Sequence, residues 1–463
     1  MNEANAGHIH PSSFRDPSGF LFWRDGMLYR QISRGYQQHY DLLMSSGLYR
    51  ELTEAGLLVA HREIPLSKHP GLPEDTYKVI APEVVPFISY PYEWCFSQLK
   101  DAALSTLEIQ RRALGRGLML KDSSAYNIQF AGGQPTLIDT LSFEAYREGA
   151  PWIAYRQFCR HFLAPLALMS RRDIRLGQLL RVHLDGIPLD LASPLLPKFT
   201  WLQFSLSAHI HLHARSERHY ERKTDRAFHG TVSRRALQAL IASLEAAVKR
   251  LTWSPRGTEW AEYYDDTNYS EQAFAQKKRM VAEFLDRSQP HTVWDLGANI
   301  GEFAAIAVDR GIPCVALDLD PAAVEKNYLA CKAAGRTRVL PLLVDLTNPS
   351  PAIGWANEER LSLGERGPAD ACLALALVHH LAISNNLPFE RIATFLASLC
   401  TWLLIEFVPK TDSQVQRLLA SREDIFTHYT EDDFEREFSR YFKVEGKVPL
   451  PAGARIMYTL RRR

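Results

Sequence analysis

The chain has 463 residues, too many for one ordinary core, so we expect two or three domains. Its 54 basic and 53 acidic side chains leave a formal net charge of +1, which gives no clear nucleic-acid signal. No apolar run approaches the roughly 20 residues of a membrane span, and the amino terminus lacks an apolar signal core. The six scattered cysteines form no C-x-x-C pair and indicate reduced core thiols, so we expect a cytoplasmic protein without a membrane partner.

Residues 19–33 predict a β-hairpin, because two β-prone runs flank Asp25 and Gly26 and Asp-Gly is a strong turn signal. The hydrophobic periodicity predicts the elements that follow. They are a helix at 36–56, strands at 57–59 and 77–80, and a long helix at 96–115.

A polar loop follows this long helix. Asp122 and Asn127 stand in D-x-x-x-x-N spacing, and Asp139 comes after a glycine turn. This pattern and the order of elements before it resemble the catalytic loop of the protein kinase-like fold. The resemblance implies that Asp122 orients an acceptor hydroxyl, while Asn127 and Asp139 hold Mg²⁺.

The same region departs from the kinase pattern, since the first hairpin has no glycine-rich phosphate loop and no V-A-I-K lysine is evident. A kinase-like fold that presents a substrate is therefore an alternative to an active phosphotransferase. A coincidental spacing in an α+β domain is the third interpretation.

Residues 150–250 are mainly helical in pattern, and 233–252 predict one clear helix. Within this region His209, His211 and His213 alternate as an extended segment would, which places all three on one side. No acidic or cysteine ligand stands near them, so we favour a solvated or core-edge segment and predict no metal site.

A strand, a glycine turn and a helix follow one another at 292–308. Thr292–Asp295 is a short apolar run, Gly297 and Gly301 bracket the turn, and Glu302–Val308 predicts the helix. Such a unit binds nucleotides at the helix N-terminus. The turn lacks the third glycine of a dinucleotide fingerprint, which favours a ligand without a pyrophosphate.

Two further apolar strands, at 314–317 and 339–344, end at Asp318 and Asp345. With Asp295, three successive strands thus end in an acid. All three acids are expected at the carboxyl edge of one parallel sheet, where ligands bind in open α/β sheets. Asp318 also stands about 20 residues beyond the glycine turn, the usual place of a ribose-binding acid.

Residues 292–345 resemble class I S-adenosylmethionine-dependent methyltransferases. The resemblance implies an α/β, Rossmann-like domain whose seven-stranded sheet ends in an antiparallel hairpin, and the β-prone runs at 441–448 and 456–460 suit that hairpin. A doubly wound domain that binds another nucleotide, or none, is the alternative. The cofactor-binding residues that the resemblance implies are Asp295, Gly297, Asn299, Gly301, Asp318, Leu319, Asp345 and Leu346, with Tyr264 and Lys277 covering the cofactor.

The fourth strand is expected at 370–377 and the fifth at 402–405. In the methyltransferase fold the end of the fourth strand faces the transferring methyl group. The resemblance therefore implies that His380, and after it His379, is a general base. Glu406 would orient the imidazole or bind a substrate amine. A packing role for the histidines is an equal alternative.

We predict three parts: a kinase-like α+β domain at 1–190, a helical connector at 191–255 and a methyltransferase domain at 256–463. This arrangement resembles bacterial methyltransferases of the nodulation-protein NoeA type. The leading prediction is S-adenosylmethionine-dependent methylation of a small-molecule or protein acceptor that the first domain presents or selects. One alternative is a bifunctional kinase and methyltransferase that also uses ATP and Mg²⁺. The other is a non-catalytic nucleotide-binding scaffold.

Overall fold

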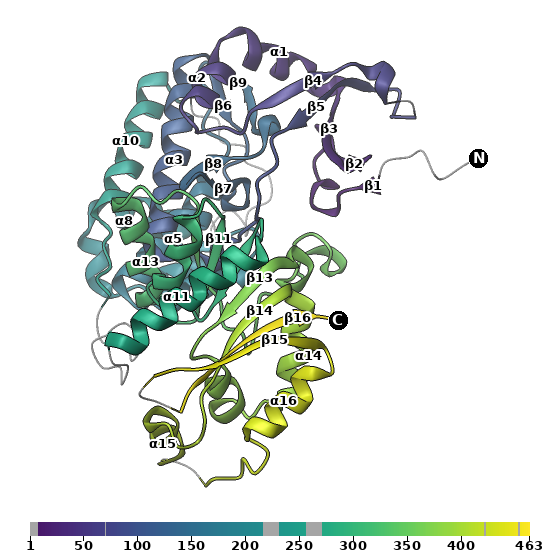
Figure 1. The fold of residues 1–463 in the computed structure, drawn as a ribbon. Helices are drawn as coiled ribbons and strands as arrows, with labels where there is room; N and C mark the ends of the chain where they lie inside the picture. The colour runs from purple at the N-terminus through teal and green to yellow at the C-terminus, as the bar shows by residue number, and fades with distance from the viewer. Residues whose placement is uncertain (1–7, 70, 216–230, 256–270, 421–422, 452–453) are drawn as a thin grey trace. The chain divides into compact units, whose positions relative to one another are not determined.

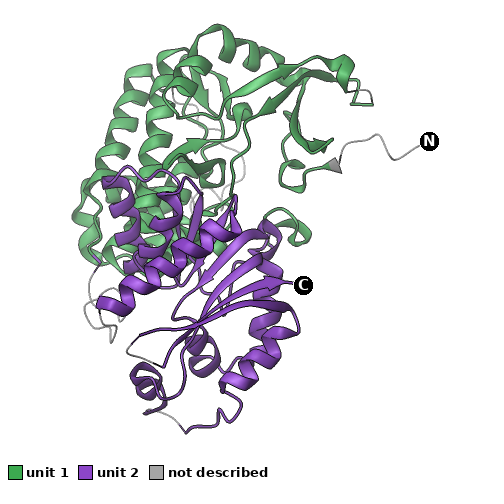
Figure 2. Ribbon diagram, viewed as in Figure 1, with its two compact units in different colours: residues 1–254, 353–360 green, residues 255–352, 361–463 purple. Residues whose placement is uncertain are grey.

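The computed structural model describes residues 8–69, 71–215, 231–255, 271–420, 423–451 and 454–463. The chain divides into two compact units, which Figure 2 shows in different colours. Unit 1 comprises Met1–Ser254 and Ile353–Arg360, and unit 2 comprises Pro255–Ala352 and Leu361–Arg463.

These bounds differ from the predicted domain bounds at two places. Residues 191–254, expected as a separate connector, belong to unit 1, and so do residues 353–360 from the expected methyltransferase domain. The physical reason for the first is that α10 (Arg234–Arg250) packs against α3 (Phe96–Gly115). Lys100 on α3 also donates to the Leu251 carbonyl at the end of α10 (2.8 Å), where a cation is favoured.

Unit 1 contains a five-stranded antiparallel sheet, visible in Figure 1. The predicted hairpin is confirmed in it, because Asp25 and Gly26 both take positive φ, as a two-residue hairpin turn requires. In spatial order the strands are β1 (His8–Ile9), β2 (Leu21–Arg24), β3 (Met27–Ser33), β5 (Thr76–Pro82) and β4 (His61–Ile64).

The helix expected at 36–56 is two helices, α1 (Gln37–Ser45) and α2 (Leu48–Glu54), because Gly47 between them has a φ of 79°. The strand expected at 57–59 forms only an isolated bridge between Leu58 and Leu137. The long helix α3 matches its prediction at both ends.

The polar loop after α3 lies between two small antiparallel sheets. β6 (Leu118–Leu120) pairs with β9 (Phe143–Ala145), and β7 (Ile128–Ala131) pairs with β8 (Gln134–Leu137). The helices that follow are α4 (Tyr155–Phe158), the π-helix η8 (Cys159–Leu163), α5 (Ala164–Arg171), α6 (Leu179–Val182), α7 (Leu189–Leu195), α8 (Phe204–Leu206), the π-helix η11 (Ser207–Leu212) and α10.

The prediction of an extended segment around the alternating histidines is wrong, since His209 and His211 lie in the π-helix η11. Hydroxyl groups satisfy their rings: His209 bonds the Tyr155 hydroxyl (2.8 Å), and His211 bonds the Ser193 hydroxyl (2.8 Å). Across the ranges that the structure describes, no cluster of histidine, cysteine and acidic residues could hold a metal ion.

Unit 2 contains the predicted seven-stranded sheet. The first five strands in spatial order run parallel to one another. The sixth, β16, is antiparallel to both of its neighbours. The order reverses at the central strand β10, which is the position where open α/β sheets bind ligands. In spatial order the strands are β12 (Val339–Leu343), β11 (Cys314–Asp318), β10 (Val293–Leu296), β13 (Ala369–Ala374), β14 (Cys400–Phe407), β16 (Ile456–Arg462) and β15 (Phe442–Pro449).

Helices complete the core of unit 2. Phe303 and Val281 belong to an apolar cluster that includes Leu373 of β13. An aromatic cluster joins α14 (Phe389–Leu399) and α16 (Glu431–Ser439) to β14, with the ring centroids of Phe389 and Phe434 5.5 Å apart. The helices are α11 (Glu271–Ser288), α12 (Glu302–Val308), α13 (Pro321–Ala333), the π-helix η14 (His380–Ser384), α14 (Phe389–Leu399), α15 (Ser413–Ala420) and α16 (Glu431–Ser439).

Two predictions about the whole chain bear on this fold. All six cysteines are buried, as expected of core thiols. None of the helices in the described ranges combines the length and the apolar character needed to cross a membrane.

Candidate functional site

The glycine turn after β10 is built from left-handed residues. Gly297, Asn299 and Gly301 have φ values of 75°, 49° and 84°. A Cβ on Gly301 would lie 2.5 Å from Oδ1 of Asn327, and one on Gly297 would lie 3.3 Å from Leu377. Both glycines therefore leave room for neighbouring protein side chains.

Asp318 is the last residue of β11 and lies beside this turn. Its carboxylate accepts hydrogen bonds from the backbone N–H groups of Asn299 (2.7 Å) and Asp320 (2.9 Å). Burial raises the pKa of Asp318 to about 6, although these two N–H groups favour the ionised form. The structure thus fixes the Asp318 carboxylate against the glycine turn.

Asp295 lies inside β10 rather than beyond its end, and it is buried. Burial raises its pKa to about 7, while the backbone N–H of Ala304 and the charge of Lys277 favour ionisation. Its Oδ2 atom has no hydrogen-bond partner among the residues that the structure describes. Most buried polar atoms of native proteins have a hydrogen-bond partner from the protein, an ordered water or a ligand, so this oxygen has capacity to accept another bond.

Asp345 follows β12 by two residues and is exposed, accepting bonds from Thr347 N–H (2.8 Å) and Oγ1 (2.7 Å). Leu319 is 59% exposed beside Asp318, and Leu346 is partly buried. Because β11 and β12 are parallel neighbours, these residues gather at one edge of the sheet, as predicted.

The fourth strand β13 ends at Ala374, three residues before its predicted end, because Ala376 has a φ of 50° and leaves the strand. His379 is buried, and its ring lies 4.0 Å from that of His380 at the start of η14. Burial, with a contribution from the Arg455 charge, lowers the pKa of His380 to about 4. Both burial and His380 lower the pKa of His379, so both rings are neutral at pH 7.

Glu406 does not lie open to a substrate amine, which corrects that expectation. It is fully buried in β14, and its Oε2 accepts from Lys277 Nζ (2.7 Å) and from the Ala376 N–H (2.9 Å). Lys277, expected to cover the cofactor, is buried in this ion pair. Tyr264 lies outside the described residues.

Arg455 completes this group and was not predicted. It lies 3.5 Å from Glu406 and 2.7 Å from Asp412 and is buried. No sequence pattern around Arg455 indicates that it pairs with Glu406 and Asp412, so only the folded structure reveals these contacts.

Unit 1 brings together the three residues of its predicted polar site. Asp139 accepts from the Ser142 hydroxyl (2.7 Å), which also lies 3.4 Å from the Asn127 amide. Asp122 accepts from Gln157 (2.8 Å), and burial raises its pKa, with the charge of Asp139 adding to the effect.

A cation of the chain itself pairs with this site. Arg30 on β3 lies 3.2 Å from Asp139 and also bonds Asp16. Its side chain is 10% exposed. The guanidinium thus neutralises the carboxylate that the kinase resemblance assigned to Mg²⁺.

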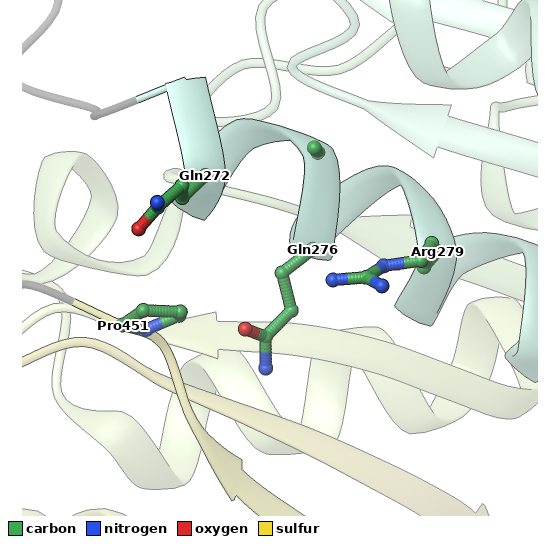
Figure 3. Close-up of a pocket in the computed structure, with 5 residues that line it drawn as sticks. Gln272, Gln276, Arg279 and Pro451 are labelled. Carbon is green, nitrogen blue, oxygen red and sulfur yellow. The ribbon is translucent and has the colours of Figure 1, made fainter.

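A separate surface pocket of about 510 Å³ runs along α11. Figure 3 shows Gln272, Gln276 and Arg279 on this helix with Pro451 opposite. None of the predicted cofactor residues lines it, so we do not place the functional site there.

Comparison with known proteins identifies a relative that matches most of the chain, while no family model matches. The nodulation protein NoeA of Rhizobium meliloti (strain 1021) is 35% identical over 456 residues, which are 97% of this chain and 95% of that protein.

Solved structures resemble parts of the chain at low similarity. Magnesium protoporphyrin IX methyltransferase (ChlM) from Synechocystis PCC 6803 is 16% identical, covers 44% of this chain and 93% of its own, and has a TM-score of 0.32. The N-methyltransferase NodS from Bradyrhizobium japonicum WM9 is 11% identical, with coverages of 42% and 98% and a TM-score of 0.31. At these TM-scores the likenesses support no conclusion. From the identity to NoeA and the coverage of both chains, the chain belongs to the family of the nodulation protein NoeA.

Proposed function

We propose that unit 2 binds S-adenosylmethionine and transfers its methyl group to a small-molecule or protein acceptor. One observation carries the proposal: the Asp318 carboxylate is held against the glycine turn by the Asn299 N–H, at the edge where the strand order reverses. A carboxylate at this position is suited to accept hydrogen bonds from two ribose hydroxyls.

Other residues at the same edge suit the remaining parts of the cofactor. The glycine turn would receive the methionine part, and Asp345 with Leu346 would lie beside the adenine. The unsatisfied Oδ2 atom of Asp295 also fits a polar ligand at this turn. S-adenosylmethionine supplies an electrophilic methyl group on a sulfonium.

The chain's own residues would align the acceptor with this methyl group and exclude water. A proton acceptor is needed only when the nucleophile arrives protonated. His380 is neutral at pH 7 and can take that proton, although a pKa of about 4 makes it a weak base. Its role therefore suits an acceptor whose proton becomes acidic as the methyl group bonds.

For unit 1 we propose a role in presenting or selecting the acceptor. The Arg30 guanidinium that pairs with Asp139 supports this role over phosphotransfer, because Mg²⁺ at Asp139 would have to displace it. The bifunctional kinase remains the alternative, and it requires binding of ATP with Mg²⁺. Calorimetric titration of Mg·ATP into the protein distinguishes the two.

Calorimetric titration of S-adenosylmethionine into the purified chain tests the main proposal. Bacterial extracts given the protein and methyl-labelled cofactor are then searched for a product that has gained one methylene. We expect saturable binding and one labelled product that boiled protein does not yield. Absence of binding would refute the proposal, and binding without any product would favour the nucleotide-binding scaffold.

A further inference from the structure

The turn between β13 and the two histidines has an unfavourable backbone conformation. Ala376 has a φ of 50°, in the left-handed region where a Cβ costs free energy. Such a residue persists only when its surroundings hold it in place. His379 and His380 follow this turn directly, so its conformation sets where both rings lie.

Glu406 contacts the backbone of this turn directly. Its Oε2 accepts the Ala376 N–H at 2.9 Å and the Lys277 ammonium at 2.7 Å. Glu406 is 0% and Lys277 2% exposed, so water does not compete for these bonds. One carboxylate oxygen therefore connects α11, β14 and the end of β13.

Two more charges complete the network. Arg455 lies 3.5 Å from Glu406 and is bonded to Asp412 at 2.7 and 3.1 Å. The network holds two cations and two anions, so its formal charge is zero. A buried ion pair contributes little net stability compared with apolar residues of the same volume. Its specific effect is therefore on orientation.

We propose that Glu406 is a positioning residue, which, supported by Lys277, holds the left-handed turn at Ala376 and thereby places His379 and His380 at the carboxyl edge of the sheet. The inference rests on the proposed methyl transfer for its functional consequence. Its structural content, the dependence of the turn on Glu406, can be measured without any substrate.

Two double variants test the hydrogen bond to Ala376. Lys277→Met/Glu406→Gln and Lys277→Met/Glu406→Met each remove one cation and one anion, so Arg455 and Asp412 stay balanced. Glutamine retains an oxygen that can accept the Ala376 N–H, whereas methionine, of similar volume, does not; Lys277→Met/Glu406→Ala is the smaller alanine variant. All of these proteins lose the ion pair, and glutamine alone also keeps an oxygen beside Arg455.

Three measurements are made on these proteins: amide hydrogen exchange of residues 375–380, calorimetric affinity for S-adenosylmethionine, and the initial rate of labelled methyl transfer into a bacterial extract. In the methionine and alanine variants we expect exchange about tenfold faster and transfer at least about tenfold slower than in the glutamine variant, because small misplacement of reacting groups is costly. The affinities of the double variants for S-adenosylmethionine should agree within about twofold.

Equal exchange and equal transfer rates in the glutamine and methionine variants would overturn the inference. If wild-type protein does not bind S-adenosylmethionine, the proposed function fails, while the exchange comparison still decides the positioning role. If no double variant folds, the wild-type protein decides: an Ala376 amide that exchanges at the rate of an unfolded chain would overturn the inference.

Discussion

Replacement of Asp318 by asparagine is the sharpest test of the cofactor site. The carboxylate bonds the N–H groups of Asn299 and Asp320, so alanine would remove both bonds and disturb the turn itself. Asparagine keeps one acceptor oxygen and nearly the same shape. Asp318→Asn therefore tests binding with less damage to the fold than Asp318→Ala.

The magnitude follows from the bonds that a carboxylate makes. A hydrogen bond to a charged group contributes about 1.5–3 kcal/mol. Loss of one such bond to a ribose hydroxyl should weaken S-adenosylmethionine binding about 10- to 150-fold. The loss of one backbone bond lowers stability by a similar amount.

In the wild-type protein, the ionised Asp318 carboxylate itself costs stability at neutral pH because burial disfavours its charge. Replacement by asparagine removes this cost and so partly offsets the lost backbone bond. The folded-state pKa of Asp318, about 6, lies above the ordinary aspartate pKa of 3.8, so stability that is present at low pH is lost as pH rises through about 6. Asparagine has no such cost. We therefore expect only a small change in melting temperature at pH 7.5.

The assay is calorimetric titration of S-adenosylmethionine, with a thermal melt on the same preparation. Asp309→Asn is the matched control, because this substitution also removes one negative charge from unit 2. Asp309 is exposed, and its carboxylate lies 3.9 Å from the exposed Arg336 guanidinium. The control should bind like wild type. A folded Asp318→Asn protein with wild-type affinity would refute the assignment of Asp318 to the site.

Further predictions concern pH, packing and catalysis. The affinity of the wild-type protein for S-adenosylmethionine should fall about tenfold between pH 8 and pH 5, because protonation of Asp318 removes the ionised acceptor of the ribose bonds. Calorimetry on Asp318→Asn should show a smaller change of affinity with pH. Gly301→Ala should lower the melting temperature by several degrees, because its Cβ would lie 2.5 Å from the Asn327 amide oxygen and its φ is 84°; an unchanged melt would contradict this packing. His380→Ala should slow methyl transfer about 10²-fold in the extract assay, the lower end for a general base, because its pKa of about 4 makes it a weak one. Cofactor affinity should be unchanged, and wild-type transfer by the folded variant would reject its role as a base.

The sequence by itself determined the elements whose signals are local. The Asp25–Gly26 turn, α3 and α12 all lie where the sequence predicted them. Turn residues and helix periodicity act within a few residues, so one stretch of chain suffices to identify these elements. The order of strands that end in acids likewise indicated the edge of the sheet at which Asp318 lies, whereas the number of strands was implied only by the resemblance to class I methyltransferases.

Only the tertiary structure decided which side chains meet. Lys277 and Glu406 are 129 residues apart and form one buried ion pair, which no local pattern indicates. The same holds for Asn327 against Gly301 and for Arg30 against Asp139. The physical reason is that burial makes each charge depend on its partner, and partners distant in sequence are brought together only by the packing of the whole unit.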